Sequence, residues 1–377
     1  MIRKSPDVIT EVVGSIGLIT LNRPKALNAL SLPMVQALLD TLQAWKHDTA
    51  VIGVAIRGSN KNGQPGRPEA LFGAFCAGGD IRFFHQAALE GNADLDTFFT
   101  DEYTLNHLIH HYPKPYIAFM DGIVMGGGMG ISQGASLRIV SEKTKMAMPE
   151  TGIGLFPDVG GGYFLSRCPG HVGEYLALTG DVIDGEQAVA WALADVCVQS
   201  DALSAMWSEV QSQTSAEALA QWIATQMIAA KAINTRAIAV FGTEMEAAFA
   251  QATIPEILAH LDQSDTEPSR AAAKTLRQRS PLMLHVVLEQ VRRARSMTLA
   301  DDLRMERDLV QHCFYTAHLD RSGASSETVE GIRALAVDKD HQPRWNPASI
   351  EQVTPAMVEP FFVSPWPASA HPLKDLM

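Results

Sequence analysis

The sequence predicts an α/β fold followed by a mainly helical C-terminal part. Strand-like apolar runs alternate with helix-like segments over about the first 200 residues, which is typical of repeated strand–helix units. Beyond them the composition becomes rich in Ala, Gln, Glu and Arg and takes on helical periodicity. We therefore expect two parts, residues 1–200 and residues 201–377.

The first predicted elements are a hairpin, a helix and a strand. Residues 8–22 hold two strand-like runs, VITEVV and GLITLN, around a Gly-Ser pair that is typical of a hairpin turn. Ser31 is the expected N-cap of an amphipathic helix that has Pro33 in its first turn. The run VIGVAIRG at 51–58 predicts a buried strand.

Further strand-like runs and two long helical patterns follow. The strand-like runs are LFGAFC at 71–76, PYIAFMDGIV at 115–124, SLRIV at 136–140 and KMAMP at 145–149. The helical patterns are ALAQWIATQM and LMLHVVLEQVRRA, both in the second part. Polar breaks at 262–269 and 320–327 predict exposed loops, and the proline-rich tail predicts an extended segment.

Charge and composition narrow the class of protein. A formal net charge of −12 should repel nucleic acid and anionic membranes, so we expect neither as a partner. The basic N-terminal tip has no apolar run for a signal peptide, and Asp7 and Glu11 argue against a transit peptide. The four cysteines are widely spaced, as is typical of free thiols in a reducing compartment. We expect a cytoplasmic protein without a metal site.

Three glycine-rich turns are candidates for ligand contacts: CAGGD at 76–80, MGGGMG at 125–130 and GLFPDVGGG at 154–162. Glycine lets bare backbone N–H groups approach a ligand, and two such groups aimed at one carbonyl oxygen would form an oxyanion hole. A helix beginning at Gly127 would add its positive end. Each turn alone could equally be a tight connection. No turn matches a dinucleotide or nucleoside triphosphate motif.

Two carboxylates stand on the third turn. Glu150 follows Pro149 and Asp158 follows Pro157, both among apolar neighbours. Such surroundings raise the pKa of a carboxyl group, and a second acid nearby separates the two values, which suits proton transfer. The structural alternatives are that Glu150 ends a strand in solvent and that Asp158 caps a helix beginning near Gly160. The residues alone leave both interpretations open.

A competing motif lies in the second turn. Residues 130–134 match G-x-S-x-G, the nucleophile elbow of α/β-hydrolases, with Ser132 as nucleophile. That motif needs the serine on the turn itself, whereas here the glycines already form the turn and Ser132 should lie inside the helix. We therefore expect its hydroxyl to bond a helical carbonyl.

Four ordered motifs together resemble the crotonase (enoyl-CoA hydratase/isomerase) superfamily. They are NRPKALNAL at 22–30, FCAGGDI at 75–81, MGGGMGIS at 125–132 and MPETGIGLFPDVGGG at 148–162. The resemblance continues with YLALTGDVIDGEQAVAWALAD at 175–195 and covers essentially the first 200 residues. It implies a crotonase-like spiral of ββα units for that part.

Within this superfamily the chain resembles the 3-hydroxyisobutyryl-CoA hydrolases most. The similarity lies in PDVGGGYFLSR, in DEYTLN at 101–106 and in VEGIRALAVDKDHQPRWNP at 329–347. Hydratases place a second catalytic glutamate where this chain has Gly130, so the acid pair that adds water is incomplete. Eight residues beyond Glu150, where hydratases carry glycine, this chain has Asp158, as the hydrolase branch does.

The resemblance implies a role for each site residue. The N–H groups of Gly79 and Gly127 would form the oxyanion hole, and Glu150 and Asp158 would be the catalytic carboxylates. Glu102 matches a substrate-contacting glutamate, although without the resemblance it would be a solvated helix charge. The implied substrate contacts are Glu102, Gly127, Glu150 and Asp158, and the implied coenzyme A contacts are Lys25 and Ala26, with Arg23 as a further cation. Coenzyme A would enter as part of the substrate, and no cofactor is implied.

The implied reaction is hydrolysis of a short-chain hydroxyacyl-CoA thioester, namely 3-hydroxyisobutyryl-CoA in valine degradation. Glu150 would activate water as general base or attack the thioester directly, and the sequence leaves both routes open. Three other functions stay open: an enoyl-CoA hydratase or isomerase, a serine hydrolase using Ser132, and a non-catalytic acyl-CoA-binding protein. A homo-oligomer also stays open, since members of the superfamily often form trimers.

Overall fold

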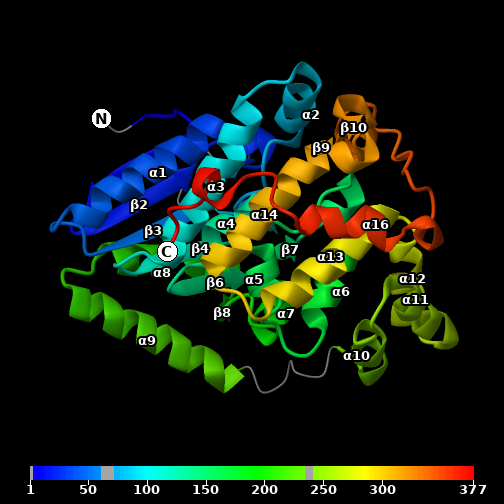
Figure 1. The fold of residues 1–377 in the computed structure, drawn as a ribbon. Coiled ribbons are helices and arrows are strands. Elements are labelled where there is room, and N and C mark those ends of the chain that lie inside the picture. The colour runs from blue at the N-terminus through cyan, green and yellow to red at the C-terminus, as the bar shows by residue number, and fades with distance from the viewer. Residues whose placement is uncertain (1–2, 61–71, 234–240) are drawn as a thin grey trace. The chain divides into compact units, whose positions relative to one another are not determined.

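The computed structural model describes residues 3–60, 72–233 and 241–377 (Figure 1). Its packing divides the chain into two compact units. The first unit consists of Met1–Gly79, Thr104–Ala147 and Val182–Val240, and the second of Asp80–Tyr103, Met148–Asp181 and Phe241–Met377. The segments of the two units alternate along the chain, whereas the predicted division has a single boundary, near residue 200. The predicted division stays a prediction.

A six-stranded mixed sheet forms the centre of the first unit, in the order β1-β2-β3-β4-β6-β8. β1 and β2 pair antiparallel as the predicted hairpin, and the other neighbouring strands pair in parallel. β2, β3 and β4 bury every residue, which explains their continuous apolar runs. The strands are β1 Val8–Val13, β2 Ile16–Leu21, β3 Gly53–Gly58, β4 Tyr116–Met120, β6 Leu137–Ser141 and β8 Val196–Val198.

The first unit contains the helices α1 Leu32–His47, α4 Gly127–Gln133, α7 Gly185–Ala190, α8 Leu203–Gln211 and α9 Ala216–Ile233. The part of α3 Asp94–His110 from Thr104 onward also belongs to this unit. Ser31 is the N-cap residue of α1, as predicted, although its side chain makes no capping hydrogen bond. In Figure 1, α1 lies along the hairpin. The ring of Trp45, on α1, fills the space that a side chain at Gly17 would need.

The apolar core of the first unit lies between the sheet and helices α8 and α9. Leu203, Trp207 and Leu219 from these helices pack against sheet residues such as Phe119. Arg57 of β3 is buried beside this core, and its guanidinium lies 4.0 Å from the ring centroid of Trp207. Burial lowers the pKa of Arg57 to about 10, so the cation is retained at neutral pH.

A second, two-stranded parallel sheet pairs β5 Ile123–Met125 with β7 Lys145–Ala147. The predicted strand at 71–76 is wrong over its described residues, because Cys76 makes only an isolated bridge to Val124. The side chain of Asn28 donates to Ala74 O at 2.8 Å, so a side chain satisfies this carbonyl in place of a strand ladder. Residue 71 lies outside the described residues.

The second unit is almost wholly helical where the structure describes it, as predicted for the C-terminal part. Its helices are α2 Ile81–Glu90, the first part of α3, η3 Glu150–Ile153, α5 Gly161–Leu165, α6 Val172–Thr179, α10 Thr243–Phe249, α11 Ile254–Gln263, α12 Glu267–Leu276, α13 Pro281–Ala294, α14 Leu299–Phe314, α15 Glu327–Ile332 and α16 Pro355–Val358. Short strands β9 Tyr315–Thr316 and β10 Arg321–Ser322 pair antiparallel.

Two of the predicted loops are shorter than expected. The loop at 262–269 is shorter because Thr266 caps α12 and Pro268 lies in the first turn of that helix. Proline suits this turn, since the N–H that it lacks would have no acceptor within the helix. The break at 320–327 contains β10, and Ser326 caps α15. In both cases residues that favour turns serve as helix starts.

The second unit is organised around α13 and α14. α13 packs against α5 and α6, and α14 packs against α5. Aromatic rings from α2, α3 and α14 form a cluster whose neighbouring members include Phe84 and Phe98, with centroids 4.8 Å apart, and Phe99 and Phe314, 5.8 Å apart. No helix among the described residues is long and apolar enough to cross a membrane.

We expect Gly128→Ala to destabilise the first unit. A Cβ at Gly128 would lie 2.4 Å from the carbonyl oxygen of Cys76, which is backbone and cannot move aside cheaply. Overpacking of this kind costs about 1–3 kcal/mol in the free energy of unfolding. Urea unfolding of the purified protein measures it. Gly242→Ala, at a position with open space, is the matched control and should change the midpoint less.

Candidate active site

The two glycine turns of the first unit lie against each other. Met125 N donates to Cys76 O at 3.0 Å, and a Cβ built on Gly78 would lie 3.6 Å from Gly127 N. Gly78 has a φ of +98° and Gly126 a φ of +47°, so both turns use the left-handed region that favours glycine. The CAGGD and MGGGMG motifs therefore meet in space.

The predicted oxyanion-hole donors are available. Among the described residues, neither the N–H of Gly79 nor that of Gly127 has a hydrogen-bond acceptor in the protein. Gly127 is the first residue of α4, so its N–H also lies at the positive end of a helix, as predicted. Two free N–H groups on adjoining turns are what binding of a carbonyl oxygen requires.

The residues predicted to contact coenzyme A lie on a neighbouring turn. Lys25 and Ala26 belong to a 3-10 turn, Pro24–Ala26, and Lys25 is exposed. The same segment is tied to the first glycine turn, because Leu30 N donates to Gly78 O at 2.8 Å. The Arg23 guanidinium donates to Ala29 O at 3.0 Å, so part of it is engaged in holding this turn.

The predicted carboxylates all belong to the second unit, and all are buried. Glu102 is 1% exposed, Glu150 is 7% exposed and Asp158 is 6% exposed. Glu102 lies on α3, Glu150 begins η3, and Asp158 lies on the loop before α5. Tyr103, next to Glu102, donates its hydroxyl to Asp158 Oδ2 at 2.9 Å. The helix and the loop are thus joined at the acids.

The three acids perturb one another. Burial, followed by the charges of Asp158 and Glu150, raises the pKa of Glu102 well above its ordinary value. Burial and then the charge of Asp158 raise the pKa of Glu150 in the same direction. Burial raises the pKa of Asp158 to about 7, although the Tyr103 hydroxyl opposes the change. Such a cluster holds protons near neutral pH and can exchange them.

The structural alternatives for these acids are wrong. Glu150 is not a solvent-exposed strand end, and Glu102 is not a solvated helix charge, since both are buried. Asp158 does not cap α5. The N-cap residue of α5 is Gly160, which has no side chain that could cap the helix. The side chains therefore have no evident local structural role that would explain their burial.

Ser132 does not have the geometry of a nucleophile elbow. It is fully buried within α4, and its hydroxyl donates to Gly128 O at 2.8 Å. This is the bond to a helical carbonyl that the sequence predicts, so the hydroxyl is used within its own helix.

In the described part of the chain, no group of three or more His, Cys, Asp or Glu side chains could hold a metal ion.

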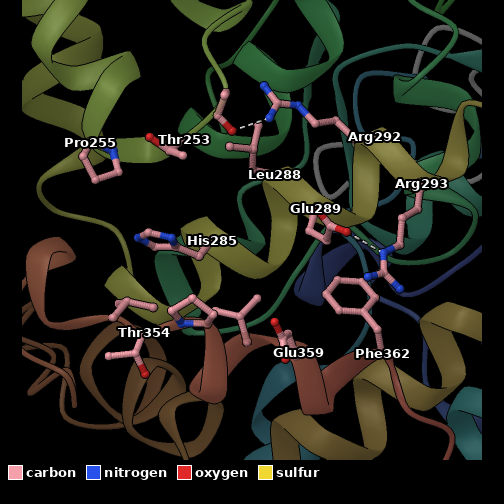
Figure 2. Close-up of a pocket in the computed structure, with 14 residues that line it drawn as sticks. Thr253, Pro255, His285, Leu288, Glu289, Arg292, Arg293, Thr354, Glu359 and Phe362 are labelled. Atoms are coloured by element: carbon pink, nitrogen blue, oxygen red, sulfur yellow. Dashed lines mark hydrogen bonds and ion pairs between the residues drawn. The ribbon is translucent and has the colours of Figure 1, made fainter.

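The second unit contains a pocket of about 460 Å³. Figure 2 shows the side chains of His285, Glu289 and Arg293 from α13 above those of the segment that carries Glu359 and Phe362. Arg293 pairs with Glu289 at 2.7 Å and stacks on the Phe362 ring. None of the predicted catalytic residues lines this pocket. The chemistry of the buried acids is therefore the better guide to the active site.

The sequence did not single out several residues that surround the acids. Tyr103 lies in the DEYTLN motif, but nothing in the motif indicates its bond to Asp158. Gln290, Asp302 and Glu306 contact the Asp158 loop from α13 and α14, far along the chain. Their spacing carries no local pattern, so no signal pointed to them.

Comparison with known proteins supports the resemblance. A family model described as enoyl-CoA hydratase/isomerase matches residues 16–362. The chain is 36% identical over 361 residues to the mitochondrial 3-hydroxyisobutyryl-CoA hydrolase of Gallus gallus, covering 94% of this chain and 88% of that protein. It is 35% identical over 352 residues to the mitochondrial enzyme of Homo sapiens, covering 92% and 86%.

Two solved structures are similar over nearly their whole length. A carnitinyl-CoA dehydratase from Mycobacterium thermoresistibile is 37% identical with a TM-score of 0.82, covering 98% of this chain and 99% of that one. An enoyl-CoA hydratase from Rhodobacter sphaeroides is 32% identical with a TM-score of 0.80, covering 95% and 98%. The predicted crotonase-like α/β fold is thereby confirmed. The chain belongs to the enoyl-CoA hydratase/isomerase family.

Proposed function

We propose that the chain is an acyl-CoA thioester hydrolase that converts 3-hydroxyisobutyryl-CoA to 3-hydroxyisobutyrate and coenzyme A. The observation that carries this proposal is the buried group of Glu102, Glu150 and Asp158, in which the Tyr103 hydroxyl donates to Asp158. Relatives about 36% identical over 94% of the chain carry the name of this hydrolase. Because the position of the hydratase's second glutamate is Gly130, inside α4, the chain lacks the side chain for adding water to a double bond.

In this proposal the N–H groups of Gly79 and Gly127 stabilise the negative oxygen that forms when the thioester carbonyl is attacked. Removal of one such donor typically costs about 3 kcal/mol of transition-state stabilisation. The leaving group is a thiolate, whose conjugate thiol has a pKa near 8.5, so it needs little help from a general acid. The acids are therefore needed for the attacking step.

Glu150 is the proposed base or nucleophile of that step, and Asp158 orients it or the water. Their mutual effect on pKa means that they titrate as a pair rather than as independent groups. Glu102, whose Oε1 is buried without a hydrogen-bond partner among the described residues, is the proposed contact for a polar atom of the acyl group. Lys25 is the proposed cation for a coenzyme A phosphate.

Several further assignments belong to the same proposal. Coenzyme A enters only as part of the substrate, and no cofactor is needed for the reaction. A role in valine catabolism and a homo-oligomeric state stay predictions. The cytoplasmic location also stays a prediction, and the animal relatives are named as mitochondrial proteins.

The substrate assignment is tested with two thioesters. The purified chain should release free thiol from 3-hydroxyisobutyryl-CoA and should not hydrate crotonyl-CoA, which loses its enoyl absorbance on hydration. Hydration of crotonyl-CoA without thiol release would establish the rival hydratase function. Binding of both thioesters without turnover of either would indicate a non-catalytic acyl-CoA-binding protein.

We expect Glu150→Gln to lower kcat for 3-hydroxyisobutyryl-CoA by about 100-fold or more, because an amide can neither accept the proton nor attack. The measurement is steady-state thiol release at pH 8. Glu217→Gln, an exposed glutamate on α9, is the matched control and should leave kcat unchanged. Turnover by Glu150→Gln near that of the wild type would remove Glu150 from the mechanism.

Tyr103→Phe should shift the pH dependence of the reaction. The Tyr103 hydroxyl stabilises the charged form of Asp158, so its loss raises the pKa of Asp158 from about 7 towards higher pH. The acidic limb of the pH profile of kcat/KM should move to higher pH. We expect kcat/KM to fall about tenfold at pH 6 and by less at pH 9, relative to the wild type. Tyr112→Phe, whose hydroxyl bonds Leu42 O, is the control. An unshifted limb would show that Asp158 does not control activity.

A further inference from the structure

The loop that carries Asp158 is held from outside its own segment. α5, which follows the loop, has only five residues, and its N-cap Gly160 offers no side chain to the first N–H groups. The Glu306 carboxylate on α14 accepts hydrogen bonds from Gly160 N at 2.7 Å and from Gly162 N at 2.9 Å. The two oxygens of one carboxylate thus replace the missing cap.

Two neighbouring side chains extend this contact. Asp302 lies one turn before Glu306 on α14, and its carboxylate accepts a hydrogen bond from Tyr163 N at 2.9 Å. Gln290 of α13 donates to Pro157 O at 2.7 Å and to Glu306 Oε1 at 3.2 Å. The backbone is therefore bonded on both sides of Asp158, at the residue before it and at three of the next five.

The loop backbone needs such support. Val159 has a φ of +59°, a left-handed conformation that is an outlier for a β-branched residue, and Gly160 continues it with a φ of +85°. Backbone of this kind persists only where its surroundings over-determine it. Because Val159 directly follows Asp158, its conformation sets the orientation of Asp158 relative to α5.

The two acids behind the loop are buried together. Asp302 and Glu306 have no exposed surface, and Asp302 Oδ1 has no hydrogen-bond partner among the described residues. Burial raises the pKa of Asp302 to about 7, and burial together with the charge of Asp302 raises the pKa of Glu306 well above its ordinary value, so the pair holds a proton near neutral pH. Gly162 is fitted to this pair, since a Cβ there would lie 2.4 Å from Asp302 Oδ1.

We infer that Glu306, with Asp302 and Gln290, forms a clamp that positions the Asp158 loop, so that α13 and α14 supply positioning residues for the reaction. The inference rests on the proposed function for its kinetic consequence. None of the three residues is a proposed substrate contact. The clamp acts on the substrate only through the placement of Asp158, so the C-terminal helices take part in catalysis indirectly.

Glu306→Gln tests the clamp with almost no change in volume. A glutamine has one acceptor oxygen, so one of the two glycine N–H groups loses its partner and faces an NH₂ group. Misplacement of a catalytic group by about 1 Å can cost on the order of 100-fold in rate. We expect kcat to fall 10- to 100-fold while KM stays within threefold, because Glu102 and Lys25, the proposed contacts for the acyl group and for coenzyme A, are unchanged.

The control is Asp301→Asn on the same helix, an exposed acid whose side chain accepts from Thr298 and pairs with Arg304. It should leave kcat and KM unchanged. If Glu306→Gln does not fold, Gln290→Met replaces it, because methionine keeps the length of the side chain and removes the donor to Pro157 O. This variant should lower kcat about threefold to tenfold, again without a rise in KM.

Hydrogen exchange gives a readout that does not depend on activity. The amides of Gly160 and Gly162 should exchange faster in Glu306→Gln than in the wild type, and in Asp301→Asn they should not. Unchanged exchange at both amides, or a variant with wild-type kcat or with only a raised KM, would overturn the clamp. A wild-type protein that does not hydrolyse 3-hydroxyisobutyryl-CoA would instead refute the proposed function, and the exchange result would still decide the clamp.

Discussion

Burial of carboxyl groups around the loop of residues 157–163 is the constraint on which the second unit depends. An isolated charge in such a place would cost several kcal/mol, so each group must hold a proton or find donors. Asp158 has the Tyr103 hydroxyl, and Glu306 has two glycine N–H groups. The aromatic cluster of α2, α3 and α14 excludes water from one end of α3 and so strengthens these effects. Burial of these carboxyl groups thus costs stability and at the same time shifts their pKa values.

The first unit solves a different problem, which is to bring bare backbone close to a ligand. The strands β2, β3 and β4 of its sheet are fully buried, and on the glycine turns the N–H groups of Gly79 and Gly127 have no acceptor among the described residues. A side chain at Gly128 would collide with Cys76 O, so the spacing of the turns depends on a missing Cβ. Rigid donors need no reorganisation when charge develops, which is the main advantage of an oxyanion hole.

The sequence predicted those features that have a local signature. Strand hairpins, helix starts such as Ser31 and the acids beside Pro149 and Pro157 all depend on neighbouring residues. The strand at 71–76 failed because Asn28, about 46 residues away, takes over a backbone carbonyl. The clamp could not be predicted, since Glu306 is separated from Gly160 by 146 residues and nothing in its own segment marks it. Long-range hydrogen bonds have no periodicity to detect.

The interleaving of the two units has a consequence for synthesis on the ribosome. The segments Asp80–Tyr103 and Met148–Asp181 emerge long before α13 and α14, which supply much of their packing. Until then the ring of Phe99, which packs on Phe84, lacks Phe314 and its helix, and such apolar surface favours aggregation of a nascent chain. The acids of these segments are still hydrated and charged at that stage. The proposed catalytic carboxylates thus help to keep the unfinished chain dispersed in water.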